Sequence, residues 1–165
     1  MKLFIFRHEI AVDRENFDDM DDSQRPLTEK GIKRARKSSF VFKKLVGEVD
    51  YIYTSPYLRA LQTALPYKDL FESAHFSEEK WLTPGSNPEK VLEALKELSD
   101  KKILLFSHEP LVGLLASYLL SAKTHNFINF KKGTFLHLEF PFGVRPGEAY
   151  LNWMITSGTV KKLKA

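Results

Sequence analysis

The feature that most constrains this chain is a series of short apolar segments, each followed by a stretch with helical periodicity. Ile103–Phe106 contains only apolar residues, which is typical of a strand covered on both faces of a sheet. Lys2–Phe6 and Tyr51–Thr54 are two further short strands of this kind. Strands that alternate with helices predict an α/β fold with a mainly parallel central sheet.

Helix signals lie between these strands. Thr28 is expected to cap a helix that runs to about Val46, and Gly47 is a natural stop. Proline residues are expected to open the other helices, because the first helical position needs no backbone N–H. These helices begin at Pro56, Pro88 (to Leu98) and Pro110 (to about Leu120), and two alternating strands follow at Thr134–Phe140 and Tyr150–Thr156.

Length and composition indicate one soluble domain. The chain of 165 residues shows no repeat or linker, so residues 1–165 are expected to form a single domain. The absence of cysteine excludes disulfides and thiol nucleophiles. The N-terminal residues lack a signal-peptide pattern, and no apolar run reaches the ~20 residues that a bilayer requires. We therefore expect a cytoplasmic protein with no membrane contact.

Charge is distributed unevenly around a net value of +4. Seven acidic residues lie between positions 9 and 22, where Arg14 is the single base, so the rest of the chain is strongly basic. A basic body favours anionic ligands, but no nucleic-acid motif accompanies the lysines. We expect most lysines to lie on solvated helix faces, and nucleic acid is not an expected partner.

Two histidines occupy equivalent positions in the predicted sheet. His8 follows the strand Lys2–Phe6 and His108 follows Ile103–Phe106, with Arg7 beside the first histidine. Arg59 lies one turn into the helix that comes after Tyr51–Thr54. Ligands of open α/β sheets bind beyond the carboxyl ends of the strands. A single histidine at such a place is usually structural, but this combination indicates a site.

These residue types suit phosphoryl chemistry. The arginine guanidinium is planar, permanently charged and able to bind two phosphate oxygens at once. A neutral histidine can act as a nucleophile, and a protonated one can stabilise the transferring group together with the arginines. By spacing alone, catalysis and a structural role remain about equally plausible interpretations.

Five motifs in order resemble the histidine phosphatase superfamily, the phosphoglycerate-mutase-like phosphatases. The motifs, which extend over nearly the whole chain, are Arg7-His8, Arg25 to Gly31, Thr54 to Ala64, Leu82 to Gly85 and Ser107 to Gly113, and Asn152-Trp153 also fits. The short length and the segments around Arg25 and His108 are most similar to the SixA branch, the phosphohistidine phosphatases. The resemblance implies a three-layer sandwich with helices on both faces of the sheet.

The resemblance also implies roles for individual residues. His8 would accept the phosphoryl group as a covalent phosphohistidine, while Arg7 and Arg59 would hold its oxygens. His108 would donate a hydrogen bond to the transferring group. Arg25 would be a further phosphate ligand at the pocket edge, although a surface arginine before a helix is nearly as plausible. Ser55 is expected to cap the helix at Pro56 rather than to bond a group in the pocket.

Two departures from the family pattern affect the expected activity. The family usually has glycine or alanine where this chain has Glu9, and a carboxylate beside a phosphate site is unfavourable unless it is paired or points away. We expect Glu9 to face solvent or to pair, with a role as acid or modulator as the alternative. The loop Trp81–Asn87 has no acid, which favours phosphohistidine over phosphate esters because an imidazole leaves readily after protonation by solvent.

Three functions remain open. The preferred one is a phosphatase of protein phosphohistidine in phosphorelay signalling, with a histidine phosphotransfer domain as a possible partner. The others are a phosphatase of small metabolites and a phosphoprotein-binding module that Glu9 has weakened. No cofactor or metal is expected, and a monomer is favoured.

Two further expectations concern residues outside the candidate site. An acidic loop with Asp18, Asp19, Asp21 and Asp22 could dock on a partner. His137 is expected to point to solvent.

Overall fold

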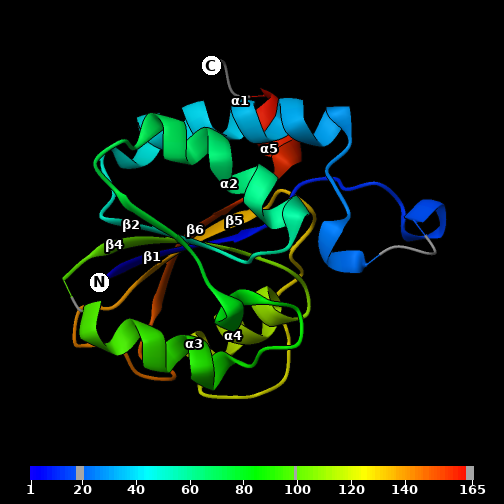
Figure 1. The fold of residues 1–165 in the computed structure, drawn as a ribbon. Coiled ribbons are helices and arrows are strands. Elements are labelled where there is room, and N and C mark those ends of the chain that lie inside the picture. The colour runs from blue at the N-terminus through cyan, green and yellow to red at the C-terminus, as the bar shows by residue number, and fades with distance from the viewer. Residues whose placement is uncertain (18–20, 99, 163–165) are drawn as a thin grey trace.

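The computed structural model describes residues 1–17, 21–98 and 100–162. Its centre is a six-stranded sheet with the order β3-β2-β4-β1-β5-β6 (Figure 1). The strands are β1 (Lys2–Arg7), β2 (Tyr51–Thr54), β3 (His75–Glu78), β4 (Lys102–Ser107), β5 (Phe135–Glu139) and β6 (Tyr150–Ile155). Strands β3, β2, β4 and β1 are parallel, whereas β5 is antiparallel to both of its neighbours. The expectation of a mainly parallel sheet is confirmed.

Helices cover both faces of this sheet, as expected for a three-layer sandwich. They are α1 (Glu29–Val46), α2 (Leu58–Leu70), α3 (Pro88–Leu95), α4 (Leu111–Ser121) and α5 (Ser157–Lys162), with short 3-10 turns between them. Helices α1, α2 and α5 lie above the sheet in Figure 1, and α3 and α4 lie below it. The α/β class of the resembled family is therefore confirmed.

The longest helix has the boundaries that its sequence predicts. The Thr28 hydroxyl accepts a hydrogen bond from the Gly31 N–H at 3.1 Å, which satisfies one of the free donors of the first turn. Gly47 ends the helix with φ at 72°, a conformation that glycine adopts without a Cβ penalty. Ala35 and Phe42 are fully buried on the inner face, so packing against the sheet fixes the orientation of the helix.

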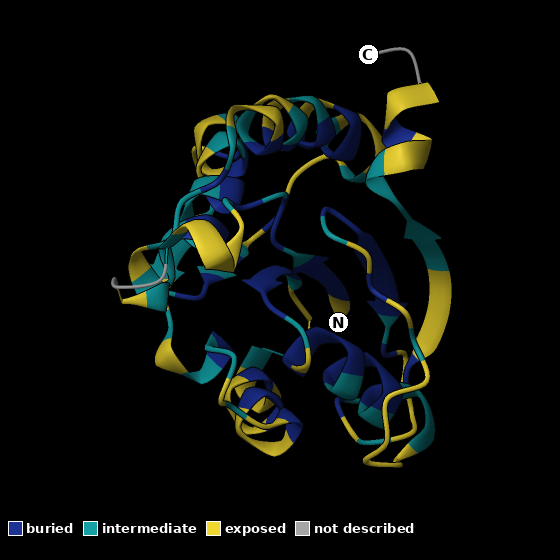
Figure 2. Ribbon diagram, turned by 90° about the vertical axis from the view of Figure 1, so that its right-hand side faces the viewer, coloured by how far each residue is buried: buried dark blue, intermediate teal, exposed yellow. Residues whose placement is uncertain are grey.

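The core has two chemically different halves, one on each face of the sheet. In β1, Leu3 and Ile5 join an aliphatic cluster on the side of α3 and α4. Phe4 and Phe6 alternate with them and join an aromatic cluster on the side of α1 and α2. The central strands β1 and β4 are accordingly buried along most of their length, while exposed positions lie on the outer faces of the helices and on the edge strand β6 (Figure 2). Burial on both faces anchors the strand ends from which the candidate site is built.

Several local expectations are wrong. Helix α2 begins at Leu58 rather than Pro56, because Pro56 lies in the turn that leads into it. The edge strand β3, which begins at His75, is absent from the elements expected from the sequence. His137 is buried rather than solvent-facing, since β6 and the Phe4 ring, 4.4 Å away between centroids, cover its side of β5. The short helix α5, which follows the last strand, was not predicted either.

Candidate active site

The sheet register brings the predicted residues to one edge. Arg7 pairs with Ser107 at the end of β1 and β4, and Thr54 pairs with Phe106 at the end of β2 and β4. The residues that follow each strand therefore emerge side by side. The rings of His8 and His108 lie 5.2 Å apart between centroids. Together with Arg7 and Arg59 they form what we call the histidine–arginine cluster.

His8 is held in one orientation by its own backbone segment. Its Nδ1 lies 2.7 Å from the Glu9 carbonyl oxygen, which can only accept, so Nδ1 carries the proton and Nε2 keeps a free lone pair. Burial lowers the pKa of His8 to about 3, against the opposing effect of the hydrogen bond to Glu9. The charges of Arg59, Arg7 and Lys132 lower the pKa further. His8 is thus a neutral imidazole at pH 7, as a nitrogen nucleophile must be.

His108 is 1% exposed and contacts a hydroxyl group. Its Nε2 lies 2.8 Å from the Ser55 Oγ. Burial lowers the pKa of His108 to about 2, and the positive charges of the nearby arginines act in the same direction. His108 is therefore neutral in the free protein. A Ser55 hydroxyl that donates to Nε2 leaves the ring proton on Nδ1.

Ser55 is accordingly more than a helix cap. Its Oγ also accepts a hydrogen bond from the Tyr57 N–H at 3.3 Å, but the N-cap residue of α2 is Tyr57. A cap was predicted because serine is common at the position before a helix. No local pattern in the sequence indicates that His108 lies beside Ser55. The contact across β2 and β4 exists only in the folded sheet.

The two arginines of the cluster are anchored through their terminal nitrogens. Arg7 Nη1 donates to the Phe130 carbonyl at 2.5 Å. Arg59 is 4% exposed, and it donates to the Asp22 backbone carbonyl at 2.7 Å and to the Asp22 carboxylate at 3.0 Å. Three buried nitrogens of the histidine–arginine cluster have no hydrogen-bond partner within the described residues: Arg7 Nε, Arg59 Nε and His108 Nδ1. These N–H groups are suited to an oxyanion, because each can donate one hydrogen bond to it.

Asp22 links Arg59 to the more peripheral Arg25. Arg25 Nε donates to one Asp22 carboxylate oxygen at 2.8 Å, and its Nη1 donates to the Val12 carbonyl at 2.8 Å. Partial burial raises the pKa of Asp22, but hydrogen bonds and charge from both arginines outweigh burial and lower it. Asp22 is therefore ionised and bridges two candidate phosphate ligands. The spacing of three residues between Asp22 and Arg25 is compatible with an ion pair, and this pair was not predicted from the sequence.

The acidic loop is thus not a uniform solvated segment. Asp22 is committed to the two arginines, and the Asp21 carboxylate accepts from the Ser23 N–H and hydroxyl at 2.9 and 2.7 Å. Asp18 and Asp19 lie outside the described residues. If the whole acidic loop docked on a partner, Asp22 would have to give up its contacts with Arg25 and Arg59.

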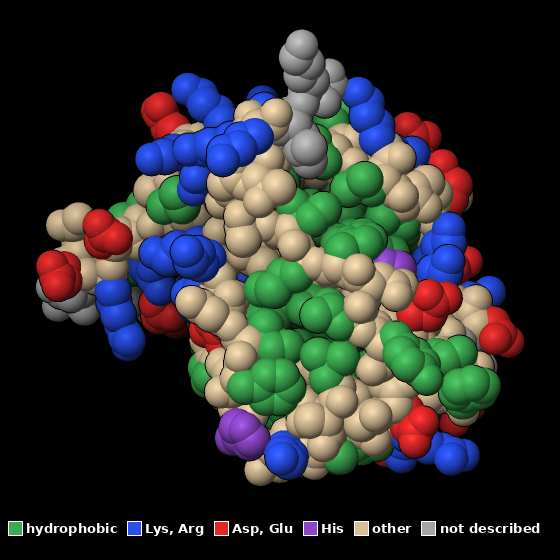
Figure 3. All heavy atoms as spheres, turned by 180° about the vertical axis from the view of Figure 1, so that it is seen from behind, with side chains coloured by type: hydrophobic (Ala, Val, Ile, Leu, Met, Phe, Trp, Pro, Cys, Tyr) green, Lys and Arg blue, Asp and Glu red, His purple; other side chains and the backbone are tan. Residues whose placement is uncertain are grey.

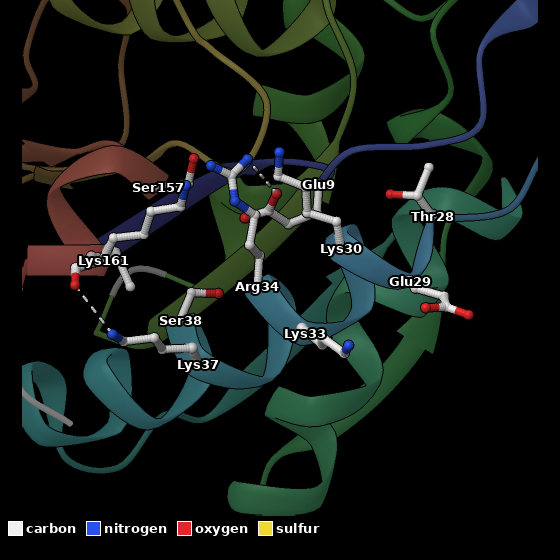
Figure 4. A pocket seen from close by; sticks show the side chains of 11 residues that line it. Glu9, Thr28, Glu29, Lys30, Lys33, Arg34, Lys37, Ser38, Ser157 and Lys161 are labelled. Carbon is white, nitrogen blue, oxygen red and sulfur yellow. Dashed lines mark hydrogen bonds and ion pairs between the residues drawn. The ribbon is translucent and has the colours of Figure 1, made fainter.

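Glu9 points toward α1 and is 1% exposed (Figure 4). One carboxylate oxygen accepts from the Ile10 N–H at 3.3 Å and lies 4.0 Å from Arg34 Nη1. The other lies against Gly133, where a Cβ would come within 2.0 Å of it. Burial raises the pKa of Glu9, and the charge of Arg34 opposes this effect. The paired alternative therefore holds with Arg34 as the partner, and the solvent-facing alternative is wrong.

Within residues 1–17, 21–98 and 100–162, two other classes of site find no support. No group of three or more histidine or acidic residues is arranged to hold a metal ion. No helix in these ranges has both the length and the apolar character needed to cross a membrane.

Comparison with known proteins assigns the family. The profile described as histidine phosphatase superfamily (branch 1) matches residues 4–83. An uncharacterized protein of Picosynechococcus sp. is 31% identical over 156 residues, 90% of this chain and 87% of that protein. Phosphohistidine phosphatase SixA of Escherichia coli is 30% identical over 171 residues, 100% of this chain and 99% of that protein. The chain belongs to the histidine phosphatase superfamily.

Solved structures agree with this assignment. The protein histidine phosphatase SixA complexed with tungstate has a TM-score of 0.83 at 27% identity, and the match covers 97% of this chain and 99% of that chain. A phosphoserine phosphatase variant from Entamoeba histolytica has a TM-score of 0.72 at 16% identity, over 96% of this chain and 98% of that chain. The second similarity shows the fold alone. The first extends to a relative of the SixA type, as the sequence motifs indicated.

Proposed function

We propose that this enzyme is a phosphohistidine phosphatase that forms a covalent phosphohistidine on His8. The single observation that carries this proposal is the 2.7 Å contact between His8 Nδ1 and the Glu9 carbonyl. It directs the unprotonated Nε2 away from the backbone, in a ring that burial keeps neutral. A neutral imidazole nitrogen with a fixed orientation is the group that nucleophilic attack on phosphorus requires.

The neighbouring groups bind the phosphoryl oxygens in this proposal. Arg7, Arg59 and His108 each offer a buried N–H, and Arg25 adds a positive charge at the edge of the pocket. His8 Nε2 attacks phosphorus, the bond to the leaving group breaks, and the leaving group receives a proton. Water then attacks the phosphorus of phospho-His8, which releases inorganic phosphate and restores His8. The arginines stabilise the negative charge that both steps concentrate on the oxygens.

The substrate proposal rests on relatives and on leaving-group chemistry. The Escherichia coli relative is named a phosphohistidine phosphatase, and the similar SixA structure holds tungstate, a tetrahedral oxyanion like phosphate. The loop at Trp81–Asn87 offers no acid to protonate an alkoxide, whereas an imidazole can take its proton from solvent. We infer that the substrate is a phosphorylated protein, with a histidine phosphotransfer domain as the finer proposal, in cytoplasmic phosphorelay signalling.

The test is phosphate release by wild type, His8→Ala and a control, His125→Ala, which removes an exposed histidine. The substrates are a phosphohistidine-containing protein and an aryl phosphate. We expect His8→Ala to lose at least about a thousandfold in kcat/KM while the control is unchanged. Wild type should form an acid-labile, base-stable phosphoprotein that His8→Ala cannot form.

The outcomes separate the alternatives that the sequence left open. Preference for the phosphoprotein supports the signalling role, and comparable turnover of a plain sugar phosphate would instead support a metabolite phosphatase. An inactive wild type that still binds the phosphoprotein would overturn the enzymatic proposal in favour of a binding module. Equal activity in wild type and His8→Ala would remove His8 from the mechanism.

A further inference from the structure

A groove of about 590 Å³ adjoins the segment that carries His8. Its walls are the first turns of α1 and the helix α5, and Glu9 lies at its floor (Figure 4). Strand β6 is antiparallel to β5, which is itself antiparallel to β1, so β6 runs in the direction of β1. Helix α5 therefore starts at the same edge of the sheet as the histidine–arginine cluster. A macromolecule that presents a phosphoryl group to His8 would extend toward this groove.

Cations dominate the rim of this groove. Four come from α1 at a spacing that places them on one face, and the fifth comes from α5: Lys30, Lys33, Arg34, Lys37 and Lys161. In Figure 3, Lys and Arg side chains gather at the left, on the side where α1 begins. Lys30, Lys33 and Lys161 have no acidic side chain within 4.0 Å among the described residues. We call this surface the basic groove.

The remaining lining indicates what kind of anion would fit. Val160 and the lysine stems supply carbon surface, Ser38, Ser157 and Thr28 supply hydroxyl groups, and Glu29 adds one exposed carboxylate. The carboxylate of Glu9 at the floor, which has the cation Arg34 beside it, would repel a polyphosphate that entered deeply. Carboxylates on a polypeptide can instead meet the exposed rim while its apolar side chains cover the carbon surface. The lining therefore favours an acidic polypeptide over a nucleic acid.

We propose that the basic groove docks an acidic segment of the phosphorylated protein substrate, next to the phosphohistidine that His8 attacks. The inference rests on the proposed function, because it names the surface by which that substrate is recognised. Charge complementarity across such a surface acts mainly on association and specificity. The groove should accordingly affect KM and salt dependence for a protein substrate, and leave the chemical step unchanged.

The experiment compares two charge-reversal variants with equal net charge. K30E/K33E reverses two exposed residues of the groove, in the first turns of α1, where glutamate suits the helix dipole. K44E/K90E is the control, with exposed lysines at the far end of α1 and on α3. The substrates are a phosphohistidine-containing histidine phosphotransfer protein and free phosphohistidine. Binding of a fluorescein-labelled polyglutamate peptide is measured separately by anisotropy.

We expect the groove variant to lose about tenfold in kcat/KM on the phosphoprotein, with unchanged turnover of free phosphohistidine and weaker peptide binding. The control should stay within about twofold of wild type in every assay. Equal losses in both variants, or a loss on free phosphohistidine, would overturn the proposal. So would a labelled DNA duplex or anionic vesicles binding the groove more tightly than the peptide. Peptide binding needs no catalysis. If the enzyme were inactive on both substrates, the proposed function would be rejected, and the peptide measurement would still decide whether the groove binds an acidic segment.

Discussion

The histidine–arginine cluster and the basic groove lie on neighbouring parts of one edge of the sheet, yet they use charge in opposite ways. In the cluster, His8, His108 and Arg59 are almost completely buried, and their hydrogen bonds fix their orientation. In the groove, Lys30 and Lys33 are exposed and have no acidic partner among the described residues. Buried charges act at full strength on a bound group, whereas exposed charges are screened and act on an approaching partner.

This difference indicates that catalysis and recognition of the proposed protein substrate can use separate surfaces of one small enzyme. A phosphoryl transfer site needs atoms placed to within fractions of an ångström, which burial and shared hydrogen bonds provide. A docking surface needs only a sign of charge and an accessible shape, which flexible lysines provide at little cost in stability. Changes in the cluster should therefore affect every substrate, and changes in the groove should affect protein substrates alone.

After His8→Ala, the largest effect is expected from R59K. Lysine keeps the charge, but its single nitrogen cannot reproduce the planar fork in which Nη1 and Nη2 hold Asp22 while Nε has no partner within the described residues. We expect kcat/KM to fall about a hundredfold on protein and small substrates alike. The matched control is R36K, at an exposed position of α1. A loss confined to the protein substrate would assign Arg59 to substrate recognition. It would contradict the distinction between the histidine–arginine cluster and the basic groove.

A smaller loss, in stability, is expected from G133A. Gly133 has φ at 71°, and an added Cβ would come within 2.0 Å of the Glu9 carboxylate. We expect the free energy of unfolding to fall by about 2–4 kcal/mol in denaturant titrations, from backbone strain and overlap together. The double variant G133A/E9G should recover the part that overlap causes. No recovery would show that Glu9 and Gly133 are not packed together.

Asp22→Asn tests the anchor between the cluster and the acidic loop. The amide keeps the shape but loses the charge that holds Arg25 and Arg59, so we expect kcat/KM to fall about tenfold on both substrates. Asp21→Asn is the control, because the Asp21 carboxylate accepts hydrogen bonds from Ser23 and, among the described residues, contacts neither arginine. An increase in activity would instead mean that the Asp22 carboxylate competes with phosphate for the arginines.

Acid should destabilise the fold through the buried histidines. The pKa of His108 is lowered by burial to about 2 in the folded protein, against about 6.5 when unfolded. Between these values the unfolded chain binds the extra proton, so His108 contributes stability above pH 6.5 that is lost as the pH falls toward 2. Relative to His108→Gln, wild type should lose up to about 1.4 kcal/mol per pH unit in this range. A constant difference from pH 7 to pH 4 would contradict the lowered pKa.

The smallest effect is expected from salt. Raising NaCl from 50 to 300 mM should lower kcat/KM for the phosphoprotein by about threefold to fivefold, because exposed charges of the groove are screened. Turnover of free phosphohistidine should change by less than about twofold, since its contacts are buried. Equal salt dependence for both substrates would remove the distinction between the two regions.

Much of the fold was predictable from the sequence because its signals are local. The boundaries of α1 follow from Thr28 and Gly47, and the apolar run Ile103–Phe106 marks a strand buried on both faces. Helix α2 was placed two residues early, and the edge strand β3 and helix α5 were missed, because short elements have weak periodicity. His137 was assigned to solvent by the alternation of β5, which cannot show that β6 and aromatic rings cover that face.

The candidate site divides in the same way. The sequence alone was enough to select the residues that we propose carry the chemistry, since Arg7, His8, Arg59 and His108 follow predicted strands within motifs that resemble one family. The hydrogen bonds that leave particular nitrogens available to a ligand are visible in the tertiary structure alone. They place the proton on His8 Nδ1, join Ser55 to His108, and hold Arg25 and Arg59 on the Asp22 carboxylate. The contacts of Ser55 with His108 and of Asp22 with Arg59 join segments tens of residues apart, whose separation is set by strand register and core packing. The contacts of His8 with Glu9 and of Asp22 with Arg25 are local in sequence, but they depend on side-chain orientations that the surrounding fold fixes.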